Sequence, residues 1–246
     1  MGKVRLITGA SGGIGGALTR RCLEAGDTVF AVSRRPVSGE ARAAYEEQRL
    51  IPVAADLTRE ADIAALMERV AGAGEALDSL IHCAGVLHDE AHGLAPEKRL
   101  EDLDGAALAH AFALNASAPM LLAKHGLPLL RRRQRAVFAS LSARVGSIAD
   151  NRLGGWYAYR ASKAAQNQFI RTFAVEARRR VPGLVVLALH PGTVDTALSR
   201  PFQRNVPEGK LFTPDFAAER LLGLIDGAGE ADSGRFLAWD GKDIPW

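Results

Sequence analysis

The 246-residue sequence lacks the features that mark secreted and membrane-spanning proteins. Its two cysteines, Cys22 and Cys83, cannot form a disulfide framework and fit a reducing compartment better than a secreted one. No continuous apolar run approaches the roughly 18 residues that a membrane span needs. The glycine-rich stretch at residue 9 leaves no room for a signal peptide before it. We therefore expect a cytoplasmic protein, and not a secreted, fibrous, disordered or membrane protein.

The chain also lacks a strong excess of charge of one sign. It has 31 Lys and Arg against 28 Asp and Glu, and its net charge of +3 does not suggest a nucleic-acid binder. The densest basic runs, at residues 131–135 and 178–180, each end an expected helix, where cations complement the helix dipole. Because neither run has interleaved aromatic residues or an adjoining apolar helical face, contact with nucleic acid or a membrane is the minority interpretation.

What the sequence does contain is a regular alternation of strand-like and helix-like segments. The expected strands cover residues 3–8, 28–33, 50–54, 77–82, 135–141, 184–190 and 234–239. The expected helices cover residues 13–25, 60–73, 157–180 and 215–226, with one or two helices interrupted by Pro119 and Pro128 over 100–130 and a polar helix or loop over 39–49. This alternation predicts βαβ units around a parallel sheet. No long linker or repeat interrupts it, so we expect one domain over residues 1–246.

A glycine-rich loop follows the first expected strand, where residues 8–15 read TGASGGIG. Glycines let the backbone turn sharply and approach a pyrophosphate closely, while the following helix presents its N-terminus to the negative charge. A glycine loop alone is equally typical of a flexible surface turn, but its place between a strand and a helix favours dinucleotide binding. The cofactor-binding residues expected here are Gly9, Ser11, Gly12, Gly13, Ile14 and Gly15.

A tyrosine and a lysine share one face of the expected helix over 157–180. Tyr159 and Lys163 are four residues apart, whereas Tyr157 lies about 240° from Lys163 around the helix and cannot make that pairing. Tyrosine titrates near pH 10, so proton transfer at neutral pH requires its phenolate to be stabilised by about 4 kcal/mol. A neighbouring ammonium, together with an oxidised nicotinamide, can provide this stabilisation.

The two motifs, in this order and about 150 residues apart, resemble those of the short-chain dehydrogenase/reductases. The resemblance covers essentially the whole chain and implies a three-layer, doubly wound Rossmann fold with a seven-stranded, mainly parallel sheet. A narrower resemblance, to the C-factor and sniffer-like carbonyl reductase group, rests on residues 146–148, 154–163 and 239–246. This group contains both carbonyl reductases and a nucleotide-binding signalling protein.

The residues after the second strand favour NADPH over NADH. An NAD site usually carries an acidic residue at the position of Ser33, whereas Ser33 and Arg34 can bind a 2′-phosphate through charge-assisted hydrogen bonds. The alternative is that Arg34 and Arg35 are solvated turn residues. The resemblance implies that Asp56, followed by Leu57, contacts the adenine, although Asp56 could simply cap the next helix.

The motif after the fourth strand departs from the family pattern. The family's Asn-Asn-Ala-Gly is replaced by residues 82–85, His-Cys-Ala-Gly. Cys83, Ala84 and Gly85 remain expected cofactor contacts, and Cys83 is expected to be a small buried hydrophobe and not a nucleophile. His82 is interpreted as a strand-end residue and not as a base.

The family's carbonyl-orienting serine is the second departure. Its position falls on Ala143, one residue after Ser142, and a slip of one residue reverses the face on which a strand side chain lies. A bulge could bring Ser142 into place, with Ser147 as the weaker substitute. If neither serine points at Tyr159, carbonyl activation rests on the tyrosine alone.

Two further stretches match the family in order. Asn115 corresponds to the asparagine that bends a helix and holds a water linking Lys163 to solvent, although it could be an ordinary polar helix residue. Residues 191–196, PGTVDT, resemble the family's Pro-Gly-x-x-x-Thr, although a proline-bearing turn after a strand would look similar. The expected cofactor contacts of this stretch are Pro191, Gly192, Val194 and Thr196.

We expect no metal site and no hydrolase triad. The histidines at 82, 88, 92 and 110 lack the spacing of zinc ligands, and no G-x-S-x-G motif is present. His190, at the end of a strand, is a possible but unsupported substrate contact.

The sequence therefore predicts reduction of a ketone or aldehyde to an alcohol by hydride transfer from NADPH. Tyr159 would supply the proton, Lys163 would lower its pKa and hold the ribose, Ser142 would orient the oxygen, and Asn115 would serve the proton path. The alternative is a C-factor-like signalling protein with little turnover. The expected partners are a small carbonyl substrate and further copies of the chain, in a homodimer or homotetramer. The loop over residues 197–213 and the segment after Gly85 would select the substrate.

Overall fold

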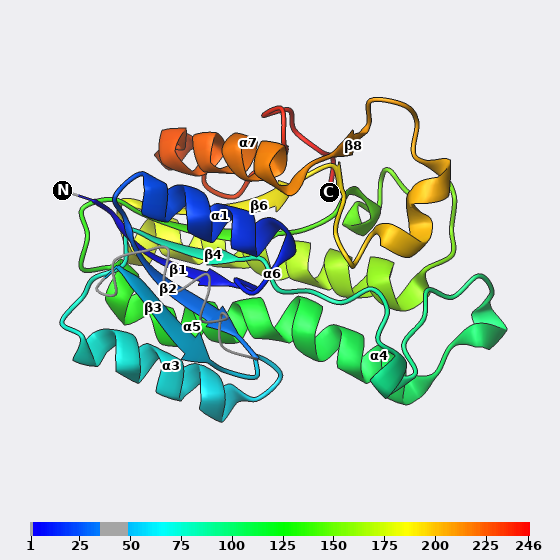
Figure 1. The fold of residues 1–246 in the computed structure, drawn as a ribbon, viewed down its shortest axis with the longest axis horizontal. Helices are drawn as coiled ribbons and strands as arrows, with labels where there is room; N and C mark the ends of the chain where they lie inside the picture. The colour runs from blue at the N-terminus through cyan, green and yellow to red at the C-terminus, as the bar shows by residue number, and fades with distance from the viewer. Residues whose placement is uncertain (1, 35–48) are drawn as a thin grey trace.

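A seven-stranded parallel sheet forms the centre of the computed structural model, which describes residues 2–34 and 49–246 (Figure 1). The sheet order is β3-β2-β1-β4-β5-β6-β9, and every pairing in it is parallel. The strands are β1 (Val4–Thr8), β2 (Thr28–Ser33), β3 (Leu50–Ala54), β4 (Ser79–His82), β5 (Ala136–Leu141), β6 (Leu184–His190) and β9 (Phe236–Ala238). This architecture confirms the expected doubly wound fold. The helix or loop expected over 39–49 lies outside the described residues, apart from Arg49.

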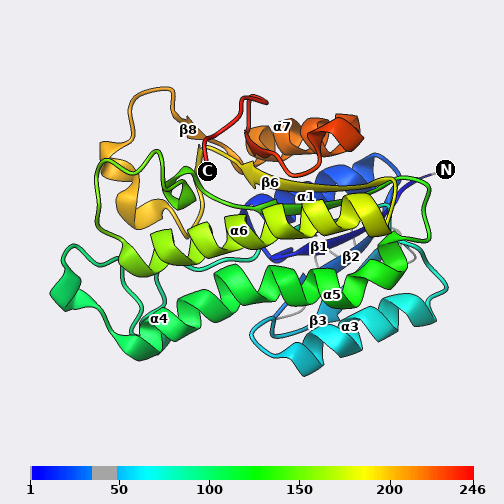
Figure 2. The same ribbon diagram turned by 180° about the vertical axis from the view of Figure 1, so that it is seen from behind.

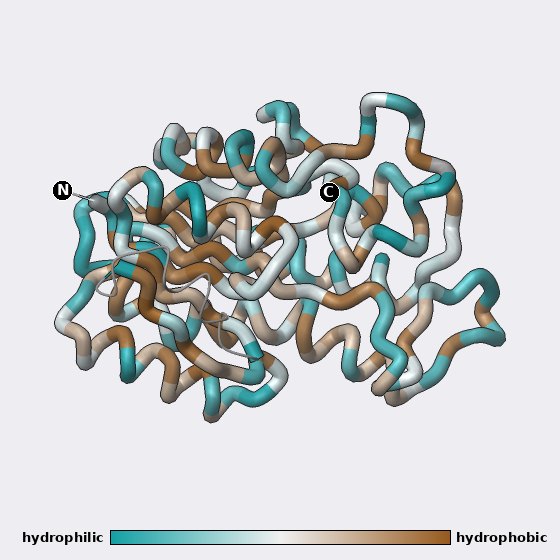
Figure 3. Tube along the Cα trace, in the orientation of Figure 1, coloured by the Kyte–Doolittle hydropathy of each residue, from teal (hydrophilic) through white to brown (hydrophobic). Residues whose placement is uncertain are grey.

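Helices cover both faces of the sheet (Figures 1 and 2). One face carries α1 (Gly13–Glu24) and α7 (Pro214–Gly227), and the other carries α3 (Glu60–Gly72), α5 (Ala118–Leu130) and α6 (Tyr157–Arg180). Adjacent residues of β1 enter opposite cores, because Leu6 packs with the α3, α5 and α6 side and Ile7 with the α1 and α7 side. Both residues are fully buried, which explains why the inner strands are apolar without alternation (Figure 3).

The interruption of the helical region over 100–130 does not lie at the prolines. After a 3-10 turn (Leu100–Asp102), α4 (Gly105–Phe112) leads through a π-helical turn (Ala113–Ser117) directly into α5. Pro119 lies in the first turn of α5, where it cannot donate the hydrogen bond that a regular helix would make to the Asn115 carbonyl, and Pro128 lies inside the last turns of α5. The irregular turn is centred instead on Asn115, and such turns often occur at functional sites.

The whole segment Gly105–Leu130 is long and apolar enough to cross a membrane by length and composition, which corrects the expectation based on continuous apolar runs. In this fold it is a core helix, because Ala116, Leu122 and Leu130 are fully buried. Its two halves pack against α3 and α6.

The turn from β1 into α1 depends on close backbone contact between two glycines. Gly9 has a left-handed φ of 68°, and Gly15, in the first turn of α1, lies directly over the Gly9 carbonyl. A Cβ on Gly15 would be 2.3 Å from the Gly9 oxygen, which is backbone and cannot rotate away. The neighbouring Gly16 has room, since its Cβ would be 3.5 Å from the nearest atom.

Gly15→Ala should therefore destabilise the protein by about 1–3 kcal/mol, because the added methyl forces α1 away from β1. Gly16→Ala in the same helical turn is the matched control and should be neutral or stabilising by about 0.5–1 kcal/mol. Urea unfolding of both variants measures the difference. Equal unfolding midpoints would show that the close contact is unimportant.

Candidate active site

A cavity of about 830 Å³ opens at the carboxyl ends of the central strands. Parallel strands bring the residues that follow them to one edge of the sheet, where ligands of such folds bind. The cavity-lining residues that the sequence predicted are Gly9, Ser11, Gly12, Gly13, Ile14, Gly15, Ser33, Arg34, Asp56, Leu57, Cys83, Ala84, Gly85, Ser142, Tyr159, Lys163, Pro191 and Thr196. Asn115, Gly192 and Val194, which the sequence also predicted, are not among the lining residues.

Glycine backbone forms one wall of the cavity. A Cβ on Gly12 would meet nothing within 4 Å among the described residues, whereas one on Gly85 would be 3.2 Å from Asn115 Oδ1 and 3.6 Å from Lys163 Nζ. The first turn of α1 begins at Gly13 and carries no charged side chain. Exposed backbone amides at a helix N-terminus are suited to a pyrophosphate, so the residues present fit a dinucleotide cofactor.

Arg34 and Asp56 lie at the β2 and β3 end of the cavity. Ser33 is buried and Arg34 is exposed, while Asp56 Oδ1 accepts hydrogen bonds from the Thr58 amide (3.0 Å) and hydroxyl (2.7 Å). Burial opposes ionisation of Asp56, but the Thr58 hydrogen bonds and the charges of Arg34 and Arg59 lower its pKa below the ordinary value. The N-cap residue of α3 is Arg59, so Asp56 does not cap this helix. Its hydrogen bonds to Thr58 stabilise the turn between β3 and α3 instead.

Tyr159 and Lys163 come together on α6, as their spacing predicts. Lys163 Nζ lies 5.9 Å from the centroid of the Tyr159 ring and donates to the Leu141 carbonyl and to Gln166 Oε1, each at 2.9 Å. Burial lowers the pKa of Lys163 to about 7 and raises the pKa of Tyr159 above its ordinary value. Burial is the cause of the Tyr159 shift, so Tyr159 keeps its proton at neutral pH in the protein alone.

Ser142 lines the cavity but is already hydrogen-bonded. Its hydroxyl donates to Asn167 Oδ1 at 2.6 Å, and Asn167 Nδ2 donates to the Gly146 carbonyl at 3.3 Å, which fixes the orientation of the amide. Ser147 Oγ accepts the Asp150 amide at 3.1 Å and is not among the cavity-lining residues. Of the two serines considered, Ser142 is the one that the structure brings to the cavity with Tyr159.

Asn115 ties the π-helical turn to the segment after β4. Its Oδ1 accepts from the Val86 amide, and its Nδ2 donates to the Val86 carbonyl (both 2.8 Å) and to Ser162 Oγ (3.1 Å). The side chain is fully buried and its polar atoms are all engaged. It therefore shapes the helix beside Lys163, and its part in a proton path remains a prediction.

The sequence interpretation missed two buried polar residues that hold the site together. Gln166 Nε2 donates to Ser140 Oγ at 2.6 Å, and Asn167 binds Ser142 as described. Both lie three or four residues after Lys163, on the buried face of α6. Polar residues on a face that otherwise packs against the core were the signal available in the sequence.

His82 is buried at the end of β4, where it pairs with Thr8 of β1. Thr8 Oγ1 accepts the amides of Cys83 (3.1 Å) and Ala84 (3.3 Å), so its own hydrogen must point to His82 Nδ1, 2.9 Å away. His82 Nε2 then carries the ring proton and has no partner among the described residues. Burial, with the Lys163 charge, lowers the pKa of His82 to about 3. The neighbouring Cys83 thiol has a pKa raised by burial, which agrees with an unreactive side chain.

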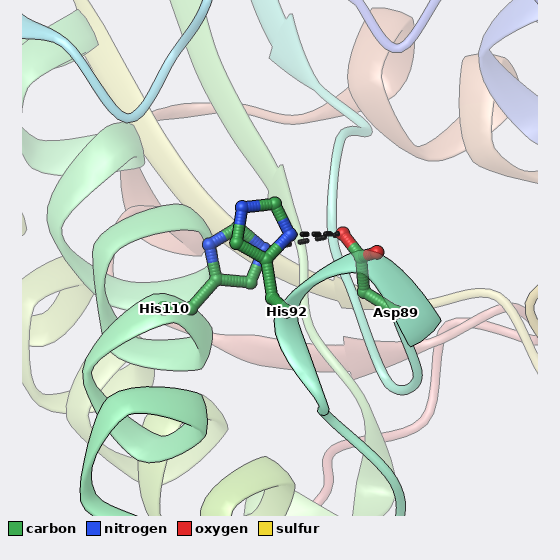
Figure 4. Close-up of side chains that lie close together, drawn as sticks. All are labelled: Asp89, His92 and His110. Carbon is green, nitrogen blue, oxygen red and sulfur yellow. Dashed lines mark hydrogen bonds and ion pairs between the residues drawn. The ribbon is translucent and has the colours of Figure 1, made fainter.

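That two of the histidines lie together was not predicted from the sequence. The fold brings His92 and His110 together with Asp89, and all three residues line the cavity (Figure 4). Spacing along the chain does not indicate this cluster, because a short turn and a separate helix supply its side chains.

Aromatic rings connect Tyr159 to the loop after β6. The Trp156 ring centroid lies 6.3 Å from that of Tyr159 and 5.1 Å from that of Phe202, and the His88 ring lies 6.0 Å from Phe202. His88 Nε2 is also 3.3 Å from the Ala197 carbonyl. The two segments that the sequence predicted to select the substrate therefore contact each other beside Tyr159.

Comparison with known proteins agrees with this geometry. The family model for short chain dehydrogenases matches residues 3–207. The chain is 37% identical over 147 residues to the C-signal protein of Myxococcus xanthus, covering 60% of this chain and 83% of that protein. It is 31% identical over 241 residues to the 1-hydroxy-2-glutathionyl-2-methyl-3-butene dehydrogenase of Rhodococcus sp. (strain AD45), covering 98% of both. The NADPH-bound carbonyl reductase from chicken fatty liver matches with a TM-score of 0.86 and 28% identity over 99% of both chains. These matches confirm the expected family and the likeness to C-factor-type and carbonyl reductase proteins.

The buried, neutral His82 should make the protein sensitive to acid. Because the pKa of His82 falls from 6.5 in the unfolded chain to about 3 in the fold, the unfolded state binds more protons between these values and stability falls as the pH drops. The loss from this residue should be about 2 kcal/mol between pH 7 and pH 5. His82→Asn, which restores the family residue, should lose about 2 kcal/mol less than the wild type in urea unfolding at the two pH values. The same pH dependence in both proteins would contradict the assignment.

Proposed function

The chain belongs to the short-chain dehydrogenase family of NAD(P)-dependent oxidoreductases, and from this premise we propose that it reduces a ketone or aldehyde to an alcohol with NADPH. The observation that carries the proposal is the placement of Tyr159 and Lys163 in the same cavity as the glycine loop. A proton donor and a cradle for a dinucleotide are the two parts that carbonyl reduction requires.

Hydride donation to a carbonyl carbon is the chemistry that the nicotinamide cofactor supplies when bound. Backbone amides of the glycine loop and the N-terminus of α1 are suited to hold its pyrophosphate. The Gly85 backbone runs next to Lys163 Nζ, so the lysine can reach ribose hydroxyls on that side of the cavity. Pro191 and Thr196 complete the lining after β6.

Tyr159 is suited to donate the proton to the carbonyl oxygen. The raised pKa of its phenol keeps the hydroxyl protonated at neutral pH, which is the form that reduction consumes. The phenolate left after transfer would be stabilised by Lys163, whose amine is held 5.9 Å from the ring by Leu141 and Gln166.

Ser142 can orient the carbonyl oxygen only by turning its hydrogen from Asn167 to the substrate. That rotation would leave Asn167 Oδ1 without its present donor, which opposes the change. We therefore place Tyr159 as the principal donor to the carbonyl oxygen, with Ser142 as a secondary one.

The preference for NADPH rests on Ser33 and Arg34. An uncharged residue followed by a guanidinium at the cavity edge suits a 2′-phosphate better than a free 2′-hydroxyl. The chicken carbonyl reductase, a structural relative with 28% identity, binds NADPH.

A nucleotide-binding signalling protein with little turnover is the second candidate, supported by the similarity to C-signal over 60% of the chain. The intact Tyr159–Lys163 pair favours the reductase, because a protein that only bound a nucleotide would have no use for a buried proton donor beside the glycine cradle.

Tyr159→Phe should lower kcat for NADPH-dependent carbonyl reduction at least about 100-fold, because the substituted ring has no proton to give. NADPH affinity should stay close to that of the wild type. Tyr157→Phe is the matched control, since Tyr157 is exposed on the same turn of α6 and should retain full activity. A panel of aldehydes, quinones, aromatic ketones and diketones, followed at 340 nm, measures the rates. Full activity in Tyr159→Phe would refute the mechanism.

Arg34→Ala should raise KM for NADPH about tenfold or more and leave KM for NADH nearly unchanged, since only NADPH carries the phosphate that the guanidinium binds. Arg59→Ala removes a nearby exposed cation that does not line the cavity and serves as control. Equal changes for both cofactors in Arg34→Ala would overturn the preference for NADPH.

A further inference from the structure

Three side chains that can bind a metal ion meet in the cavity wall, and none of them belongs to the Tyr159–Lys163 pair or to the glycine loop (Figure 4). Asp89 and His92 stand at the two ends of a short turn that is closed by a backbone bridge between Asp89 and Leu94. His110 comes from α4. One potential ligand atom of each residue lies within 4.8 Å of the other two.

The distances in this cluster are close to those of a metal site. Asp89 Oδ2 lies 3.0 Å from His92 Nδ1 and 3.4 Å from His110 Nε2. Ligand atoms of a tetrahedral zinc ion, with bonds of about 2.0–2.1 Å, are about 3.3 Å apart. The two imidazole rings are stacked, with centroids 3.8 Å apart and an interplanar angle of 6°. The lone pair of an imidazole nitrogen lies in the ring plane, so the His92 ring, which is exposed, must turn out of this stack for both histidines to bind one ion.

The hydrogen bonding of the cluster is incomplete without such an ion. Both histidines face one oxygen of the carboxylate, Asp89 Oδ2, and since a carboxylate only accepts, His92 Nδ1 must carry the hydrogen of the bond between them. His92 achieves a hydrogen bond, but the buried His110 Nε2 has no hydrogen-bond partner among the described residues.

We propose that Asp89, His92 and His110 bind a divalent first-row transition-metal ion, with Zn²⁺ as the ion that the donors suit best. Two imidazoles and one carboxylate form the open three-ligand set that leaves a fourth position for water or another molecule. Because all three residues line the cavity, that fourth position faces it. A ligand oxygen of a molecule in the cavity can therefore complete the coordination.

The site also links two parts of the active-site wall. His110 precedes Asn115 by five residues, or about 7 Å along the helix. The ion joins the turn that follows β4 to the helix that ends at the π-helical turn beside Lys163. This inference does not depend on the proposed reductase activity, because it rests on residues outside the Tyr159–Lys163 pair.

Zn²⁺ titration of untagged, metal-free full-length protein, against a chromophoric chelator, tests the proposal. We expect one equivalent bound with micromolar or tighter affinity, and a Co²⁺ complex with the strong visible absorption of four-coordinate sites. Asp89→Asn, His92→Ala and His110→Ala should each weaken Zn²⁺ binding at least tenfold. His125→Ala, which removes a surface histidine paired with Glu60, is the matched control and should bind like the wild type.

Thermal unfolding separates lost binding from lost folding. Without metal, the three variants should unfold cooperatively, and Zn²⁺ should raise the Tm of the wild type and of His125→Ala but not theirs. Absence of stoichiometric binding by the wild type, or equal binding by the three variants, would overturn the proposal. Cys83 also lines the cavity. The proposal would therefore also be overturned if Cys83→Ser lost Zn²⁺ binding while His92→Ala retained it. NADPH affinity, measured separately, tests the cofactor site and does not decide the metal site.

Discussion

The buried amine of Lys163 is the constraint on which the rest of the site depends. Removing an ammonium from water is costly unless hydrogen bonds replace the lost hydration, and here the Leu141 carbonyl and Gln166 do so. Gln166 in turn needs Ser140, which places the end of β5 against α6. Space for the lysine comes from Gly146, where a Cβ would lie 2.8 Å from the Lys163 Cβ.

A second set of contacts fixes the start of the same helix, and with it Tyr159. The buried Glu97 accepts the Ala158 amide through both carboxylate oxygens, at 3.3 and 3.2 Å, and its backbone carbonyl accepts the Trp156 amide at 2.6 Å. Trp156 itself has a left-handed φ of 53°, a conformation that costs energy for a residue with a Cβ. The first turn of α6 is thus held by Glu97, whose carboxylate accepts one otherwise unpaired N-terminal amide and whose backbone carbonyl accepts the amide before it.

The sequence was informative where local rules determine structure. The bounds of α6 and β6 agree with the expected ones, because a 3.6-residue stripe and a continuous apolar run are local signals. The Tyr159–Lys163 pairing follows from helix geometry in the same way. The place of the π-helical turn was not predicted, and the bonds that Asn115 makes within it join Val86, 29 residues away, which no local pattern indicates.

The Asp89 cluster was missed because its residues, too, are brought together only by the fold. The segment after β4, which carries Asp89, makes several such contacts. Successive residues of this segment each bind a different part of the cavity wall. Val86 pairs with Asn115 beside Lys163, His88 reaches the Ala197 carbonyl in the loop after β6, and Asp89 faces His110 on α4. Each contact joins residues that are distant in sequence, so spacing rules do not detect it. Within one short stretch, the chain connects the helix that carries Tyr159 and Lys163, the loop after β6 and the candidate metal ligands. A change in this segment would therefore disturb three walls of the cavity together, because each of these contacts holds a different wall.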